Sequence, residues 1–153
     1  MRIIFGLFSL FLLTCCNTNT ESTYKIFEEN SWNSDSIITL NQTVVDSTTR
    51  HNLYLKIRHS TDFEYQNIFL FIDFQETRDT IEVILSEKNG KWLGKGVGDV
   101  KEVEHCFAKD ITFSSKKTSI VNIEQAMRYG DQPVITNLKG IIALGLKIKK
   151  SED

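Results

Sequence analysis

Cysteine is scarce in this chain, and its positions limit how the fold can be held together. Of the three cysteines, Cys15 and Cys16 lie side by side near the start, and Cys106 stands alone in the second half. If the segment through Cys15 is removed and Cys16 is modified, Cys106 is the one thiol that remains, and no disulfide can form within the mature chain. The domain must then be held by a hydrophobic core, for which a chain of 153 residues is long enough.

Positive charge is not in excess either, since the formal net charge is −2. No cluster or run of lysine and arginine predicts a nucleic-acid partner or a basic stripe that would bind a membrane. The three histidines, His51, His59 and His105, lack the spacing of metal ligands, so the sequence predicts no metal site, and no motif predicts a cofactor. Proline occurs once, at Pro133, and the many Ile, Val, Thr and Phe residues favour strands.

A hydrophobic run covers residues 3–13 and follows the positive start Met1-Arg2. It is too short to cross a membrane as a helix, which needs about 20 apolar residues, and it has the length of the apolar core of a secretory signal peptide. A bacterial lipoprotein signal ends at the cysteine that receives the lipid, and the preceding residues favour Cys16 over Cys15 as this position. An ordinary cleaved signal peptide is the competing interpretation, and the polar stretch 17–22 argues against it.

The sequence therefore divides into four parts. Residues 1–15 are the predicted lipoprotein signal peptide, residues 16–23 the acylated cysteine with a polar tether, residues 24–150 a single folded domain, and residues 151–153 a tail. A multiply acylated cysteine holds a protein on a membrane almost permanently. The membrane is thus the first expected partner, through the N-terminal lipid.

The domain alternates apolar and polar residues with a period of two, which is typical of strands. The alternation is cleanest in residues 52–59, whereas both faces of residues 67–74 are apolar, which predicts a central strand covered on both sides. The Asn89-Gly90 dipeptide is typical of a hairpin turn. We expect about eight short strands, near Tyr24 and at residues 37–45, 52–59, 67–74, 80–85, 103–113, 119–127 and 142–148. With no convincing helix, these predict an all-β fold, an antiparallel, jelly-roll-like β-sandwich.

No group of polar residues predicts a catalytic site. Cys106 and His105 are neighbours in a predicted strand, so their side chains point to opposite faces, and we interpret Cys106 as an inert thiol. For Glu124, we expect an ion pair with Arg128 rather than a catalytic role.

The two tryptophans are the candidates for contact with a ligand or partner. Trp32 and Trp92 could form a platform for a glycan or a peptide, although core packing is the favoured interpretation for each. After Trp92, glycines at alternate positions, among them Gly94 and Gly96, leave one face of the segment without side chains. We expect an aromatic ring, in particular the Trp92 indole, or a backbone segment to lie there, with a β-bulge as the alternative.

Four parts of the chain carry a family resemblance. They are Tyr24-Lys25 with Asn30-Ser31-Trp32 after the signal, residues 52–58 continuing to 65–70, residues 89–96 with Asp99, and residues 123–128 with 138–141 and 145–148. In this order and spacing they resemble the gliding motility lipoprotein GldH family of the Bacteroidetes, over nearly the whole chain. His105-Cys106-Phe107 departs from the family pattern, so the resemblance gives Cys106 no role.

The resemblance implies a protein of the cell envelope, lipid-anchored to the outer membrane at its periplasmic face or at the cell surface. It implies a non-catalytic accessory protein of the gliding motility and secretion apparatus, which acts through contacts with other envelope proteins and not with nucleic acid. The alternative is a glycan- or peptide-binding jelly-roll module that uses exposed aromatic residues.

Overall fold

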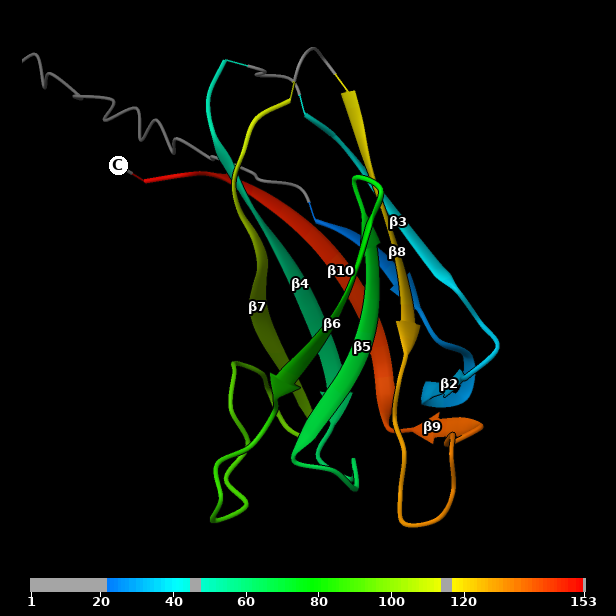
Figure 1. Ribbon diagram of the computed structural model, residues 1–153. Helices are drawn as coiled ribbons and strands as arrows, with labels where there is room; N and C mark the ends of the chain where they lie inside the picture. Colours follow the sequence, from blue (N-terminus) through cyan, green and yellow to red (C-terminus); the bar gives the residue numbers. More distant parts are fainter. Residues whose placement is uncertain (1–21, 45–47, 114–116, 153) are drawn as a thin grey trace, which may run out of the picture.

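The computed structural model describes residues 22–44, 48–113 and 117–152 (Figure 1). The predicted signal peptide, Cys15 and Cys16 lie outside the described residues. The elements are β1 (Thr23–Ile26), a short 3-10 helix η1 (Glu28–Asn30), β2 (Ser31–Asn33), β3 (Ile38–Val44), β4 (His51–Ser60), β5 (Asn67–Phe74), β6 (Thr77–Ile84), β7 (Val100–Ile111), β8 (Lys117–Gln125), β9 (Asn137–Lys139) and β10 (Ile141–Lys150). No helix within the described ranges is long and apolar enough to cross a membrane.

The strands form two four-stranded antiparallel sheets that face each other, and a small third sheet (Figure 1). The first sheet, here called the β4 sheet, has the order β1-β10-β4-β7, and the second, the β5 sheet, has the order β3-β8-β5-β6. Most long strands are followed in the chain by a strand of the opposite sheet; β5 and β6 are the exception and form a hairpin. This order is that of a jelly roll, so the predicted fold class is confirmed.

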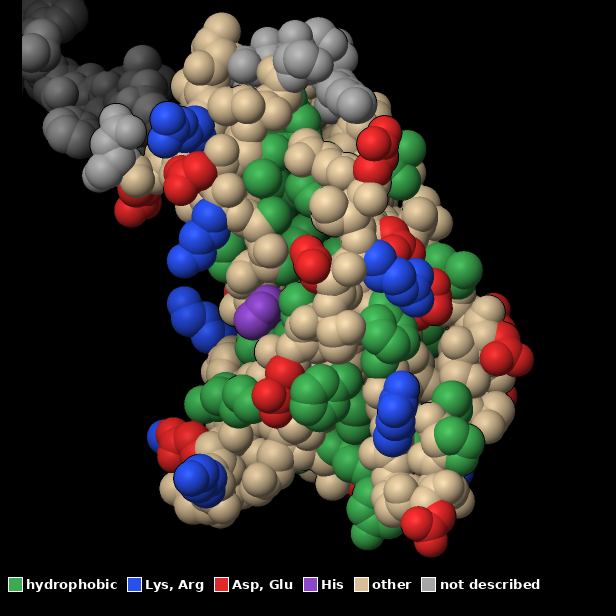
Figure 2. All heavy atoms as spheres, in the orientation of Figure 1, with side chains coloured by type: hydrophobic (Ala, Val, Ile, Leu, Met, Phe, Trp, Pro, Cys, Tyr) green, Lys and Arg blue, Asp and Glu red, His purple; other side chains and the backbone are tan. Residues whose placement is uncertain are grey.

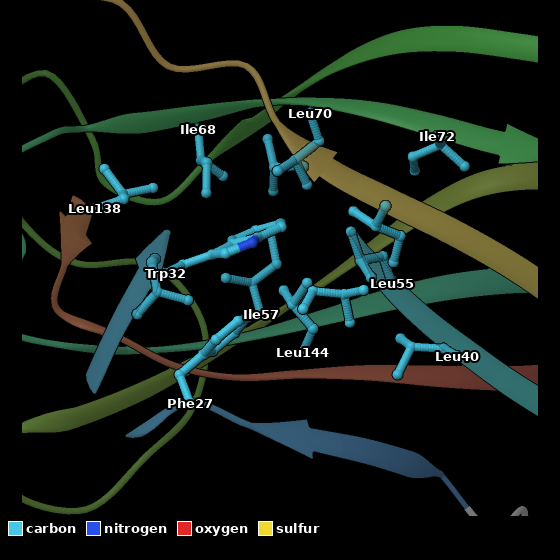
Figure 3. Close-up of a cluster of buried hydrophobic side chains, with 14 of the residues drawn as sticks. Phe27, Trp32, Leu40, Leu55, Ile57, Ile68, Leu70, Ile72, Leu138 and Leu144 are labelled. Carbon is cyan, nitrogen blue, oxygen red and sulfur yellow. The ribbon is translucent and has the colours of Figure 1, made fainter. Parts of the chain in front are cut away.

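The core lies between the two sheets and is built by alternation. In β4, Leu53, Leu55 and Ile57 are fully buried and point inward, while Tyr54 and Lys56 between them point outward. The same alternation gives the inner faces of β5, β8 and β10 (Figure 3). On one side of the sandwich β3 packs against β1 and β10, which closes that side.

Two short strands that the sequence did not predict close one end of the sandwich. The sequence analysis expected no strand at residues 31–33 or 137–139, but β2 and β9 pair there, with Trp32 opposite Leu138. The Trp32 side chain is fully buried, its ring stacks on Phe27 at 5.1 Å between centroids, and its Nε1 donates to the Ser36 carbonyl at 3.1 Å (Figure 3). Trp32 therefore has no surface to offer to a ligand.

β5 is an inner strand of its sheet, as predicted, but no segment of the described ranges covers its outer face, so the predicted cover on both sides is wrong. Phe69 is 39% exposed, and Phe71 is half-buried beneath the guanidinium of Arg78, whose Cζ lies 4.8 Å from the ring centroid. Arg78 also donates to Glu124 at 3.0 and 3.1 Å and to Asp73 at 2.8 Å. The expected pair of Glu124 with Arg128 is thus replaced by a pair with Arg78, which the register of β5 with β6 and β8 brings alongside.

The β5–β6 hairpin gives a stability prediction. Its two turn residues, Gln75 and Glu76, have φ angles of 48° and 65°, and a two-residue turn with both angles positive favours Asn-Gly. Since a non-glycine residue in the left-handed region costs about 1–2 kcal/mol, the double change Gln75→Asn with Glu76→Gly should raise the free energy of unfolding by about 1 kcal/mol. Denaturant unfolding measures this change. Gln75→Val places a β-branched residue at a positive φ and should lower the free energy of unfolding.

Candidate functional site

The residues suited to conventional catalysis do not converge. The described ranges hold no group of three or more His, Cys, Asp or Glu residues that could bind a metal ion. Cys106 lies opposite Tyr54 and points outward, whereas His105 lies opposite the buried Leu55 and points inward. The Cys106 Sγ lies 3.6 Å from the Ala108 carbonyl, to which it donates. Cysteine and histidine therefore diverge, as strand alternation predicts.

One long side of the sandwich is open, because β6 and β7 are edge strands of opposite sheets. Between them lies a cleft of about 210 Å³, lined chiefly by apolar side chains of both sheets, namely Ile72, Phe74, Ile81, Phe107, Ala108 and Ile111. Figure 2 shows hydrophobic side chains reaching the surface between these two strands. Asp79 and Thr77 of β6 add polar groups to the lining. Because this cleft reaches between the two sheets and has a mainly apolar lining, we take it as the candidate site.

The free edge of β7 borders the cleft, and the loop before β7 already pairs with this edge at one residue, Glu102. Lys95 donates its N–H to the Glu102 carbonyl at 3.0 Å, and Glu102 donates to the Lys95 carbonyl at 2.8 Å. Backbone groups point to the same edge at every second residue of a strand, so Glu104 and Cys106 direct theirs the same way. Beyond Glu102, none of the strands β1 to β10 in the described ranges pairs with this edge.

The glycines that follow Trp92 allow this pairing. A Cβ at Gly94 would lie 2.2 Å from the Glu102 carbonyl oxygen, and one at Gly96 would lie 1.9 Å from the Val100 carbonyl oxygen. The expectation that a backbone segment lies against these glycines is confirmed, and the expectation of an aromatic ring there is wrong. Trp92 is half-buried and packs instead on His59, at 4.8 Å between ring centroids.

His59 is a fully buried histidine that the sequence did not single out. Its ring is tilted against Trp92, the Phe63 ring lies 5.9 Å away between centroids, and Nδ1 donates to the Ser60 carbonyl at 2.9 Å. Burial lowers the pKa of His59 below its ordinary value, outweighing the hydrogen bond to Ser60, and the charge of Lys101 lowers it further. Burial also lowers the pKa of His105.

Stability should therefore fall on acidification. A histidine whose pKa is lowered by folding takes up its proton more readily in the unfolded chain, so its contribution is complete above about pH 6.5 and is lost as the pH falls toward the folded-state pKa. Each such histidine gives a slope of at most about 1.4 kcal/mol per pH unit. Urea unfolding between about pH 7 and 5.5 measures the slope, and His59→Gln should reduce it. His105→Gln should remove the part of the slope that His59→Gln leaves. Equal slopes in the parent protein, His59→Gln and His105→Gln would contradict this account.

A series of aromatic rings in contact leads from His59 to the surface of the sandwich. Phe63 contacts Tyr65 at 5.5 Å between centroids, and Tyr65 contacts Tyr129 at 6.2 Å. Tyr129 is 69% exposed, whereas Trp32 is buried and Trp92 is half-buried. The exposed aromatic residue here is thus Tyr129, to which the sequence analysis gave no role. A glycan platform built on Trp32 and Trp92 has little exposed aromatic surface to use.

The outward face of the β4 sheet carries a dense ionic network. Glu102 accepts hydrogen bonds from the Tyr24 hydroxyl at 2.9 Å and from Arg58 at 2.8 and 3.0 Å, and it pairs with Lys56 at 2.7 Å. Partial burial alone would raise the pKa of Glu102, but the hydrogen bonds from Lys56, Tyr24 and Arg58 outweigh it, and the pKa lies below its ordinary value. The Tyr24 ring lies over Gly145, where a Cβ would come within 2.6 Å of it.

Comparison with known proteins decides the family. Residues 19–148 match the family described as GldH lipoprotein. The chain belongs to the GldH lipoprotein family. It is 33% identical to a protein named "Gliding motility lipoprotein GldH homolog" from Christiangramia forsetii, with both chains covered in full. It is 28% identical to "Gliding motility lipoprotein GldH" from Flavobacterium johnsoniae, over 94% of this chain and 92% of that one.

The resemblance drawn from the sequence is therefore confirmed. The GldH match spans both sheets of the jelly roll and the open cleft between β6 and β7, since it runs from residue 19 to residue 148. Membership of a lipoprotein family makes the chain a lipoprotein of the cell envelope.

Proposed function

We propose that this GldH family member is a non-catalytic accessory protein of the gliding motility and secretion apparatus. Lipid on Cys16 holds it at the outer membrane, and it acts by binding other envelope proteins. The names of the two relatives support the process, because both are gliding motility lipoproteins or their homologues. The open side of the sandwich supports the mode of action.

The partner presents an extended segment that enters the cleft between β6 and β7. Such a segment pairs with the edge of β7 beyond Glu102, continuing the antiparallel pairing that Lys95 begins. Because side chains of a strand alternate, every second side chain of the segment then reaches the apolar lining around Phe107 and Ile81. The lining favours binding over chemistry, since apolar groups dominate it.

The cleft is tested by recovering partners from membranes with tagged protein. Ile81→Asp places a charge in the cleft, and Ile120→Asp places the same charge on the outer face of the β5 sheet, where Ile120 is 57% exposed. We expect the envelope proteins recovered with the parent to be recovered with Ile120→Asp and lost with Ile81→Asp, once thermal melts show that both variants are folded. Recovery of the same partners by both variants would exclude the cleft as the contact surface.

The lipid anchor is tested by substitution of each cysteine in turn. Cys16→Ala should release the protein from the membrane fraction, because the acylated position is lost, whereas Cys15→Ala should leave it there. Membrane fractionation followed by detection of the protein measures both outcomes. A Cys16→Ala protein that is still acylated would show that Cys15 carries the lipid.

A further inference from the structure

The fold separates charge between the two outer faces of the sandwich. The charged side chains that point outward from the central part of the β4 sheet form a group that we call the basic face. It holds four cations and two carboxylates. These are Lys56, Arg58, Lys147 and Lys149 against Glu102 and Glu104. An excess of positive charge thus gathers on one face of a chain whose formal net charge is −2.

The opposite face has the opposite sign. Among the described side chains, the outward charged residues of the β5 sheet are Asp73, Glu82 and Glu124, with Arg78 as their cation. A separate hollow beyond the basic face is lined by Asp110 and Glu152 together with Arg50 and Lys150, so its positive and negative charges are equal in number. The sandwich is therefore electrically polar from one sheet to the other.

The chain enters the fold on the positive side. β1 is the edge strand of the β4 sheet, and it begins at Thr23. The next residue, Tyr24, reaches across Gly145 so that its hydroxyl contacts Glu102 in the basic face. The tether from Cys16 to Thr23 spans at most roughly 25 Å when fully extended. An acylated Cys16 thus keeps the edge of the β4 sheet close to the bilayer.

An exposed apolar side chain stands beside the same face. The segment that pairs with Glu102 continues through Gly96 to Val97, which is 92% exposed. Val97 and Lys95 border a hollow of about 260 Å³ together with Arg58 and Glu102 of the basic face. Cations next to an exposed apolar side chain are typical of surfaces that rest on the interface of an anionic membrane.

From these placements we propose that the basic face is the membrane-facing surface of the anchored protein, with Val97 in contact with the interfacial region of a bilayer that carries anionic headgroups. The inference rests on the proposed lipid anchor, which supplies proximity, while the basic face supplies orientation. A small excess of positive charge acts only within about a Debye length of the surface, roughly 10 Å at moderate salt, so it has effect only in a protein already held there.

This orientation leaves the cleft free. β7 is an edge strand of the β4 sheet, and its open side lies at the border of that sheet, not on its outer face. With the β4 sheet against the bilayer, the cleft between β6 and β7 opens sideways along the membrane. A partner in the same membrane layer can then reach it.

The test uses the acylated full-length protein in vesicles of phosphatidylcholine with a quarter phosphatidylglycerol. In a Cys106→Ser background, an environment-sensitive fluorophore is attached either to Val97→Cys or, as the matched control on the opposite face, to Ile120→Cys. We expect the probe at residue 97 to be shielded several-fold from an aqueous quencher and the probe at residue 120 to be accessible. High salt, vesicles of phosphatidylcholine alone, or Lys147→Gln with Lys149→Gln should remove the shielding, whereas Arg78→Gln on the far face should not.

The outcomes separate the orientation from the anchor. Equal access of quencher to both probes, in protein that floats with the vesicles, overturns the orientation and leaves the anchor standing. Shielding at residue 97 that persists on neutral vesicles at high salt overturns the role of charge. Protein that does not float with the vesicles at all refutes the anchor, and the orientation with it.

Discussion

Replacement of Trp32 by alanine should lower the free energy of unfolding by about 3–5 kcal/mol, as is typical of a large aromatic residue removed from a core. The Trp32 side chain is fully buried, it stacks on Phe27, and it lies in one cluster with Ile57, Ile68 and Leu138 (Figure 3). Its loss leaves a cavity at the end of the sandwich and removes the donor to the Ser36 carbonyl. Since domains are stable by only about 5–15 kcal/mol, the amount of folded protein should fall visibly.

Trp92→Ala is the matched control, because it deletes the same side chain at a shallower site. Trp92 is half-buried against His59, so we expect a smaller shift of the denaturant midpoint than for Trp32→Ala. If Trp32→Ala left the midpoint at its parental value, the pairing of β2 with β9 would not be part of the core. If Trp92→Ala kept full stability but lost partner recovery, Trp92 would instead be a contact residue.

The long strands could be predicted because their alternation is local. In β4, three buried leucine and isoleucine residues alternate with polar ones, and no knowledge of neighbours is needed to orient them. β2 and β9 could not be predicted, because each has three residues and lies within turn-forming sequence. β6 begins at Thr77 and not near residue 80, because its turn, Gln75-Glu76, lacks the residues by which such turns are recognised.

The candidate site depends on topology, which the sequence pattern leaves open. Apolar residues such as Phe74 and Phe107 predict burial, but only the strand order shows that β6 and β7 leave a cleft between them. The basic face is likewise absent from the linear sequence, where Lys56 and Lys147 lie far apart and no run of cations occurs. They share one face because β10 pairs with β4, in a register that places Lys56 opposite Gly145.

The glycines of the loop before β7 give the second large prediction. Gly94 combines two constraints, since its φ is +82° and a Cβ would lie 2.2 Å from the Glu102 carbonyl oxygen. Gly94→Ala therefore adds backbone strain of about 1–2 kcal/mol to overpacking of about 1–3 kcal/mol, and should lower the free energy of unfolding by about 2–5 kcal/mol. The clash falls on the backbone of β7, which cannot move aside as a flexible side chain can.

Two neighbouring glycines separate these contributions. Gly90 has a φ of +87° with nothing within 4 Å of a Cβ, so Gly90→Ala should show the strain alone. Gly96 has no positive φ, but a Cβ there would lie 1.9 Å from the Val100 carbonyl oxygen, so Gly96→Ala should show the clash alone. Urea midpoints of the three variants should place Gly94→Ala lowest. Equal losses for Gly90→Ala and Gly94→Ala would mean that the loop swings away from Glu102 at little cost, and that the edge of β7 is already free along its whole length.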